Sequence, residues 1–134
     1  MLDPHGALIY TMVMVSAADS DMTDAELAII GEIVGHLPVF RDFDREQLPR
    51  VLEACTRLLN REDGLEEGFT EIKQALPANL RETAYALACD VAAADGEATQ
   101  EELRVLELMR HRLNIDRLIA AGIERGARAR FQRL

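Results

Sequence analysis

Two short acidic segments carry the residues best suited to chemistry. The segments Asp19–Glu32 and Asp90–Glu102 each hold five acids and neither Lys nor Arg. Carboxylates that gather without a basic residue nearby repel one another, and a hard divalent cation relieves this repulsion. Oxygen ligands without nearby Cys or His favour Ca²⁺ or Mg²⁺ over Zn²⁺. The acids that we single out for such a site are Asp19, Asp21, Asp95 and Glu97.

The two segments are copies of one motif. A shift of 76 residues places Val15–Leu27 over Val91–Leu103, and seven of the thirteen positions are then identical. Both copies read Ala-Ala-Asp-x-[Asp/Glu]-x-Thr-x-x-Glu-Leu. A Thr followed three residues later by Glu is a capping box, which satisfies free amide donors at the start of a helix. The sequence therefore predicts that Thr23 with Glu26, and Thr99 with Glu102, begin two equivalent helices.

The turn before each capping box has a second interpretation. The pattern is too short for the twelve-residue loop of an EF-hand, so any cation affinity is weak or needs both turns. A solvated acidic face that docks a basic protein partner explains the same residues. At the turn itself, Gly96 reaches positive φ more easily than Ser20, which occupies the matching place in the first copy.

The remaining pattern indicates helices throughout. Apolar residues recur every three or four positions, and no segment alternates with period two over a useful length. Leu8–Ala18 is nearly all apolar and predicts a buried helix, and a third helix is expected to begin near Asp44. Asn79 with Glu82 suggests a further capping box. We expect an all-α fold of about seven helices in one domain over residues 1–134, with internal repeats at about 5–60 and 78–134.

Composition excludes several classes of protein. The formal charge of −9 argues against a nucleic-acid binder that relies on phosphate attraction. No apolar run approaches the roughly 20 residues of a membrane span, and the N-terminus lacks the basic start of a signal peptide. Cys55 and Cys89 are predicted to be buried and reduced, and the expected location is the cytoplasm. The arginine-rich segment 110–134 offers contact with the protein's own acidic face, with an acidic partner or with anionic lipid at a membrane surface.

Residues 17–26 and 93–102 together resemble the paired turns of the tellurite-resistance TerB-like family, and length, helical content and duplication fit it over the whole chain. The resemblance implies a bundle of about seven helices made of two repeats. It also implies a stress-response role in the cytoplasm or at a membrane, an acidic cation site and no established catalytic activity. The positions that match the motif are Asp19, Asp21 and Glu26 in the first copy and Asp95, Glu97 and Glu102 in the second. Ser20 departs from the usual glycine.

The leading hypothesis is a non-enzymatic module whose two acidic turns bind a divalent cation or dock a protein partner. A metal-dependent hydrolase with paired carboxylates is an alternative that requires a pocket beside the turns and a candidate base. A purely structural homodimer is a third possibility, which an exposed apolar helix face would favour.

Overall fold

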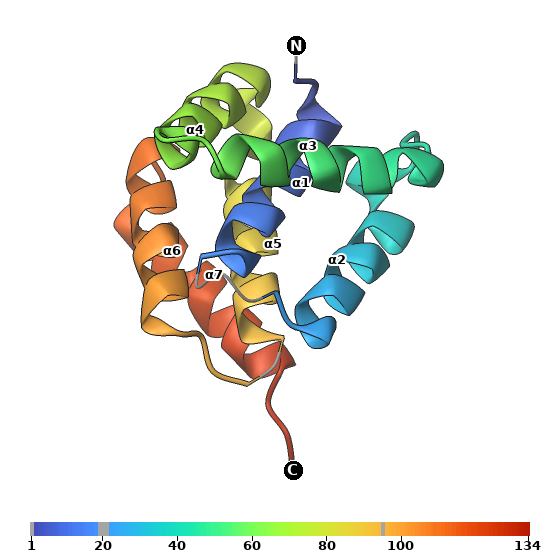
Figure 1. Cartoon of the computed structure of the whole chain (residues 1–134). Helices are drawn as coiled ribbons and strands as arrows, with labels where there is room; N and C mark the ends of the chain where they lie inside the picture. The colour runs from blue at the N-terminus through green and yellow to red at the C-terminus, as the bar shows by residue number, and fades with distance from the viewer. Residues whose placement is uncertain (1, 19–21, 95) are drawn as a thin grey trace.

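The computed structural model describes residues 2–18, 22–94 and 96–134. Within these residues the chain forms seven α-helices and no β-strand, which confirms the all-α prediction (Figure 1). None of the described helices combines the length and the apolar character that a membrane span needs. The helices are α1 (Pro4–Ser16), α2 (Asp24–His36), α3 (Leu48–Leu59), α4 (Gly64–Ala75), α5 (Arg81–Ala93), α6 (Gln100–Arg112) and α7 (Arg117–Arg130).

Helix α1 forms the centre of the bundle. Every residue from Gly6 to Ser16 is buried, so this helix has no solvated face. A helix that is apolar all round must be covered on all sides, and α1 packs against α3, α4, α5 and α6. Helix α5 lies beside it, and both helices run in the same direction (Figure 1). The C-terminal ends of α1 and α5 therefore point toward the same end of the molecule.

The other helices repeat around this central pair. Helices α2 and α6 have equal lengths, and each boundary of α6 lies 76 residues beyond the matching boundary of α2. Helix α3 packs on α1 as α7 packs on α5. The capped helices also cross between the halves, because α2 contacts α5 and α6 contacts α1. Helix α4, which packs on α1 and α3, has no counterpart after α7 among the described residues.

Two predicted helix starts need correction, and both involve short 3-10 turns. The Asn79–Glu82 capping box is wrong, because Ala78–Leu80 forms a 3-10 turn in which the Leu80 amide donates to the Pro77 carbonyl at 3.0 Å. Helix α5 then begins at Arg81 without a side-chain cap. The third helix was expected near Asp44. That residue instead caps a 3-10 turn, Arg45–Gln47, and α3 follows with a proline in its first turn.

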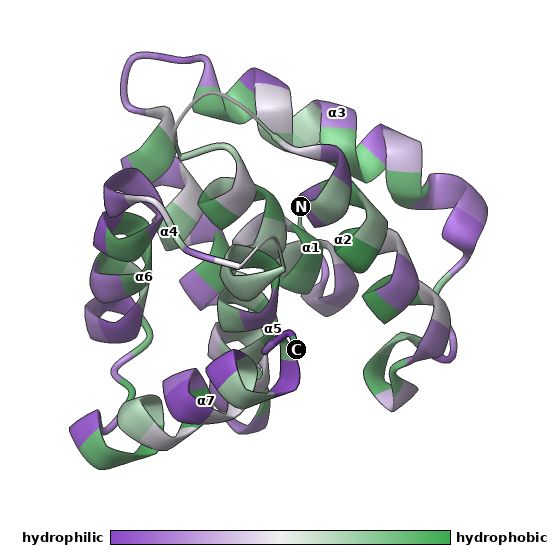
Figure 2. Cartoon of the chain, turned by 90° about the horizontal axis from the view of Figure 1, so that it is seen from below, coloured by the Kyte–Doolittle hydropathy of each residue, from purple (hydrophilic) through white to green (hydrophobic). Residues whose placement is uncertain are grey.

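Polar residues cover the outside of this core. Figure 2 shows hydrophilic residues along the outer faces of α3, α6 and α7, whereas the ribbon of α1 is mostly hydrophobic. The two cysteines are buried and free, as predicted.

Candidate functional site

The first acidic turn leads into a complete capping box. The Glu26 amide donates to Thr23 Oγ1 at 3.1 Å, and the Thr23 amide donates to Glu26 Oε1 at 3.0 Å. The hydroxyl of Ser16, at the end of α1, also donates to Glu26 Oε1 at 3.2 Å. The Glu26 residue is only 1% exposed. Glu26 therefore fastens the start of α2 to the end of α1, and the capping prediction is confirmed.

The second turn repeats this arrangement with one difference. The Glu102 amide donates to Thr99 Oγ1 at 3.1 Å, and the Thr99 amide donates to Glu102 Oε1 at 2.9 Å. Glu102 is 2% exposed, but the place of Ser16 is taken by Ala92. Gly96 has a φ of +107°, the left-handed conformation that the sequence predicts for this turn.

The six predicted metal ligands fall into three groups. Asp19, Asp21 and Asp95 lie outside the described residues. Glu26 and Glu102 are the buried capping residues, and Glu97 is exposed just after the end of α5. Within residues 2–18, 22–94 and 96–134, no three His, Cys, Asp or Glu side chains come together in a group that could hold a metal ion.

Exposed acids collect around the starts of α2 and α6, and we call Asp24, Glu97 and Glu101 the acidic end. The described residues form three ion pairs, Arg61–Glu67, Arg112–Glu66 and Arg130–Asp90, and none of them includes a member of the acidic end. These carboxylates thus face solvent without a basic partner from the described part of the chain.

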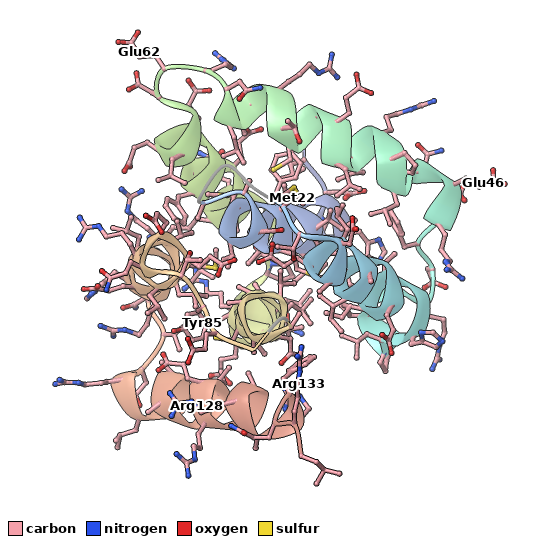
Figure 3. The ribbon with its side chains drawn as sticks, turned by 60° about the horizontal axis from the view of Figure 1, so that its bottom comes forward. Met22, Glu46, Glu62, Tyr85, Arg128 and Arg133 are labelled. Carbon is pink, nitrogen blue, oxygen red and sulfur yellow. The ribbon has the colours of Figure 1, made fainter. Side chains whose placement is uncertain are left out.

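Part of the arginine-rich C-terminal segment lies near Glu97, because Arg128 and Arg133 line the same surface groove as that carboxylate. Arg112 and Arg130 pair with the protein's own Glu66 and Asp90, which accounts for part of the segment's charge. Figure 3 shows Arg128 and Arg133 on the α7 side, opposite Glu46 and Glu62 at the two ends of α3. Arg128 and Arg133 are therefore separated from the acids at the ends of α3, but not from Glu97.

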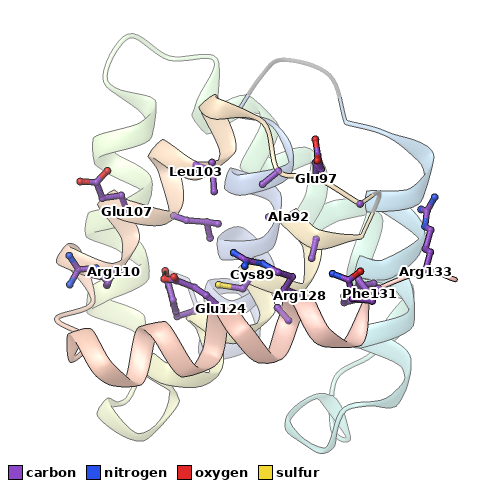
Figure 4. Close-up of a pocket in the computed structure, with 17 residues that line it drawn as sticks. Cys89, Ala92, Glu97, Leu103, Glu107, Arg110, Glu124, Arg128, Phe131 and Arg133 are labelled. Atoms are coloured by element: carbon purple, nitrogen blue, oxygen red, sulfur yellow. Dashed lines mark hydrogen bonds between the residues drawn. The ribbon is translucent and has the colours of Figure 1, made fainter.

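A groove of about 800 Å³ opens between α6 and α7, with α5 as its floor (Figure 4). Its volume lies in the range of small-molecule sites. Both wall helices pack against α5 rather than closely against each other. Apolar and small side chains cover the floor and walls, and charged side chains stand around them. The residues that line the groove include Tyr85, Cys89, Ala92, Glu97, Ala98, Leu103, Leu106, Glu107, Arg110, Glu124, Ala127, Arg128 and Phe131.

The sequence reasoning missed this groove, although the repeat carries a signal for it. Ala98 lies at the position of Met22 in the first copy. Both side chains are partly buried and pack against the core, and Ala98 also lines the groove. The smaller side chain of the second copy occupies less volume at the edge of the groove than a methionine would.

Tyr85 and Cys89 form the polar part of the groove floor. Tyr85 is 2% exposed, and its hydroxyl donates to Glu124 Oε2 at 2.5 Å. Burial, together with this hydrogen bond, raises the pKa of Tyr85 well above its usual range. Burial, with the nearby charge of Glu124, raises the pKa of Cys89 to about 12. A thiol that stays protonated at neutral pH is a poor nucleophile.

Both cysteines are expected to be inert toward thiol reagents while the protein is folded. Burial also raises the pKa of Cys55 to about 12. With an unfolded value of about 8.5, the folded protein holds about a thousandfold less thiolate at pH 8. The difference in thiolate content is measured by the rate of reaction with a disulfide reagent, which is compared between the folded protein and the protein unfolded in urea. Cys55→Ser and Cys89→Ser assign each thiol, and a thiol that reacts equally fast in both states would contradict its burial.

The same shifts give stability a definite pH dependence. Each thiol ionises more readily in the unfolded chain than in the folded one. Its contribution to stability is therefore complete below about pH 8.5 and is lost as pH rises toward 12.

Comparison with known proteins adds one finding. The model of a family described as tellurite resistance protein TerB matches residues 5–122, a span that runs from α1 into α7 and includes both capped turns. No curated protein matches the chain, and no solved structure matches it.

Proposed function

The chain belongs to the tellurite resistance protein TerB family, and we propose that it works as a non-enzymatic binding module whose acidic end docks a basic segment of a protein partner. The observation that carries this proposal is the exposure of Asp24, Glu97 and Glu101 without an ion pair to any described residue. Opposite charge across an interface accelerates association and selects the partner. We place this activity in a cytoplasmic stress response, following the resemblance to the family.

A divalent cation at the two acidic turns is the second candidate function. It is favoured by the oxygen-only ligands and by the duplication of the turns at the ends of two parallel helices. The capping bonds engage one oxygen of Glu26 and one of Glu102. The proposed cation ligands outside the caps are therefore Asp19, Asp21, Asp95 and Glu97.

A metal-dependent hydrolase is less well supported than a binding module. The groove does place a cavity beside Glu97, as that alternative requires. However, the groove is lined with apolar side chains, the Glu124 carboxylate accepts a hydrogen bond from Tyr85, and the Cys89 thiol is held protonated. Peripheral contact of the free C-terminal arginines with anionic lipid is compatible with the docking function and adds to it.

One calorimetric experiment tests both functions. Chelator-treated protein is titrated with Ca²⁺, Mg²⁺, Mn²⁺ and Zn²⁺, and separately with a twelve-residue peptide rich in Lys and Arg. The test variant for the cations carries Asp19→Asn, Asp21→Asn, Asp95→Asn and Glu97→Gln. The test variant for the peptide carries Asp24→Asn, Glu97→Gln and Glu101→Gln, which neutralises the acidic end. The matched control removes four charges elsewhere, through Asp42→Asn, Glu46→Gln, Glu53→Gln and Glu62→Gln, which are exposed residues without an ion pair to the described part of the chain.

Peptide binding that the test variant loses and the control keeps supports the docking function. Saturable cation binding that the test variant for the cations loses and the control keeps supports the cation site. If the test variant for the peptide and the control weaken peptide binding equally, only net charge matters and the acidic end is not a site. Absence of both kinds of binding to the wild type overturns the proposed function.

A further inference from the structure

We propose that the groove between α6 and α7 binds a single-chain amphiphile with an anionic head, such as a free fatty carboxylate or alkyl phosphate. The proposal rests on the shape, lining and charge of the groove; the groove shares Glu97 with the acidic end, but none of the variants that test it changes a residue of the acidic end. Three features of the molecule support the proposal. They are the size of the groove, the position of Arg128 and the repeat that relates the two halves.

The groove provides an apolar bed of suitable size. Its volume of about 800 Å³ exceeds what one alkyl chain needs and stays within the range of sites for small ligands. Along its floor and walls lie Cys89 and Ala92 from α5, Leu103 and Leu106 from α6, and Ala127 and Phe131 at the end of α7. Leu103 is 53% exposed and is therefore accessible to a ligand in the groove. An alkyl chain laid across α5 would cover Leu103.

Three arginines and three acids line the groove, and Arg128 is the arginine that lies over its floor. Figure 4 shows the Arg128 side chain reaching over the floor near Cys89, whereas Glu107 points away from it. Within the described chain Arg128 has no ion-pair partner, and the nearest acid on its own helix, Glu124, accepts the hydroxyl of Tyr85. A guanidinium is weakly hydrated and matches a carboxylate or phosphate with two parallel hydrogen bonds. Arg128 therefore provides the contact for an anionic head above the apolar bed.

The first half of the molecule indicates how to close the groove without unfolding the protein. Met22 fills the position that Ala98 holds in the second half, and it packs against the core there. Ala98→Met consequently places a methionine in the groove. The first copy of the repeat already accommodates a methionine, Met22, at the matching position. Arg128→Gln removes the head contact. Arg125→Gln is the matched control, because Arg125 is exposed on the same helix and does not line the groove.

The full chain is titrated by calorimetry, below micelle-forming concentrations, with dodecanoate and dodecyl phosphate. Dodecyl maltoside and dodecyltrimethylammonium serve as neutral and cationic counterparts. Decanoate and tetradecanoate test the apolar bed, and vesicles of phosphatidylcholine with phosphatidylglycerol test whether a bilayer is the real source of the anion. Thermal melting of each variant verifies that it is folded.

We expect one saturable site for both anions, with affinity rising about fourfold for each added methylene until the bed is full. Arg128→Gln should weaken the anions about tenfold and leave dodecyl maltoside unchanged, while Arg125→Gln changes neither. Ala98→Met should abolish binding of all chains. The proposal is overturned if the cationic chain binds as well as the anions, if Ala98→Met has no effect, if only vesicles bind, or if nothing binds. None of these results bears on the acidic end, whose peptide and cation titrations are separate.

Discussion

Replacement of Gly64 by alanine is expected to destabilise the protein by about 3 kcal/mol or more, the upper range for overpacking a tight contact. Gly64 is the first residue of α4, and a Cβ placed on it would lie 2.1 Å from the Leu58 carbonyl oxygen and 2.9 Å from the Leu59 Cα. Both atoms belong to the backbone, and the Leu58 carbonyl also accepts the Arg61 amide at 3.1 Å. The clash can be relieved only by moving α4 away from α3.

Such a movement would loosen a well-packed part of the core. Helix α4 contributes Phe69 and Ile72, which are 2% and 1% exposed. The midpoint of urea unfolding measures the effect. Gly122→Ala in α7 is the control and should stabilise the protein slightly. Nothing lies within 4 Å of a Cβ added at Gly122, and alanine is the better helix former by about 0.5–1 kcal/mol. A Gly64→Ala variant that unfolds at the wild-type urea concentration would contradict the close approach.

Replacement of Glu26 by alanine is expected to cost about 2–4 kcal/mol. The change removes a buried acceptor that serves the Thr23 amide and the Ser16 hydroxyl, and it leaves both donors without this partner. Loss of a cap costs about 1 kcal/mol, and an unsatisfied buried donor adds about 1–3 kcal/mol. Chemical denaturation with a circular-dichroism readout measures the total.

Two further variants separate the contributions to this loss. Ser16→Ala removes only the bond from α1 and should cost about 1 kcal/mol. Asp24→Ala removes an exposed acid from the same helical turn, where only the interaction with the helix dipole is lost, so the cost should be about 0.5 kcal/mol. If Glu26→Ala is no more harmful than Asp24→Ala, the capping carboxylate is not structural and becomes available for the proposed cation.

The features that sequence could predict are those set by residues close together in the chain. The Thr23 and Thr99 caps follow from a side chain and an amide three residues apart, and the positive φ of Gly96 follows from its place between two helices. The apolar run Leu8–Ala18 was sufficient to predict a buried helix, although α1 spans Pro4–Ser16 and so begins and ends earlier in the chain. The same local logic failed at Asn79, because Pro77 begins a 3-10 turn that satisfies the backbone before the helix starts.

The groove could not be predicted in this way, since it depends on how far apart two helices lie on a third. No residue in α6 or α7 specifies by itself that the two helices separate. Only the comparison of Ala98 with Met22 hints at missing volume, and it gains meaning once both positions are known to flank equivalent helices. The ion pair between Arg130 and Asp90 is equally non-local, as it joins α7 to α5.

The crossing of α2 onto α5 and of α6 onto α1 bears on the ancestry of the molecule. A lone repeat would expose the sides of its central helix that now contact the other half. Two copies related by a two-fold axis would cover each other, because each would lend its capped helix to its neighbour. We therefore infer that the present chain descends from a symmetric pair of smaller subunits, joined end to end by a duplication.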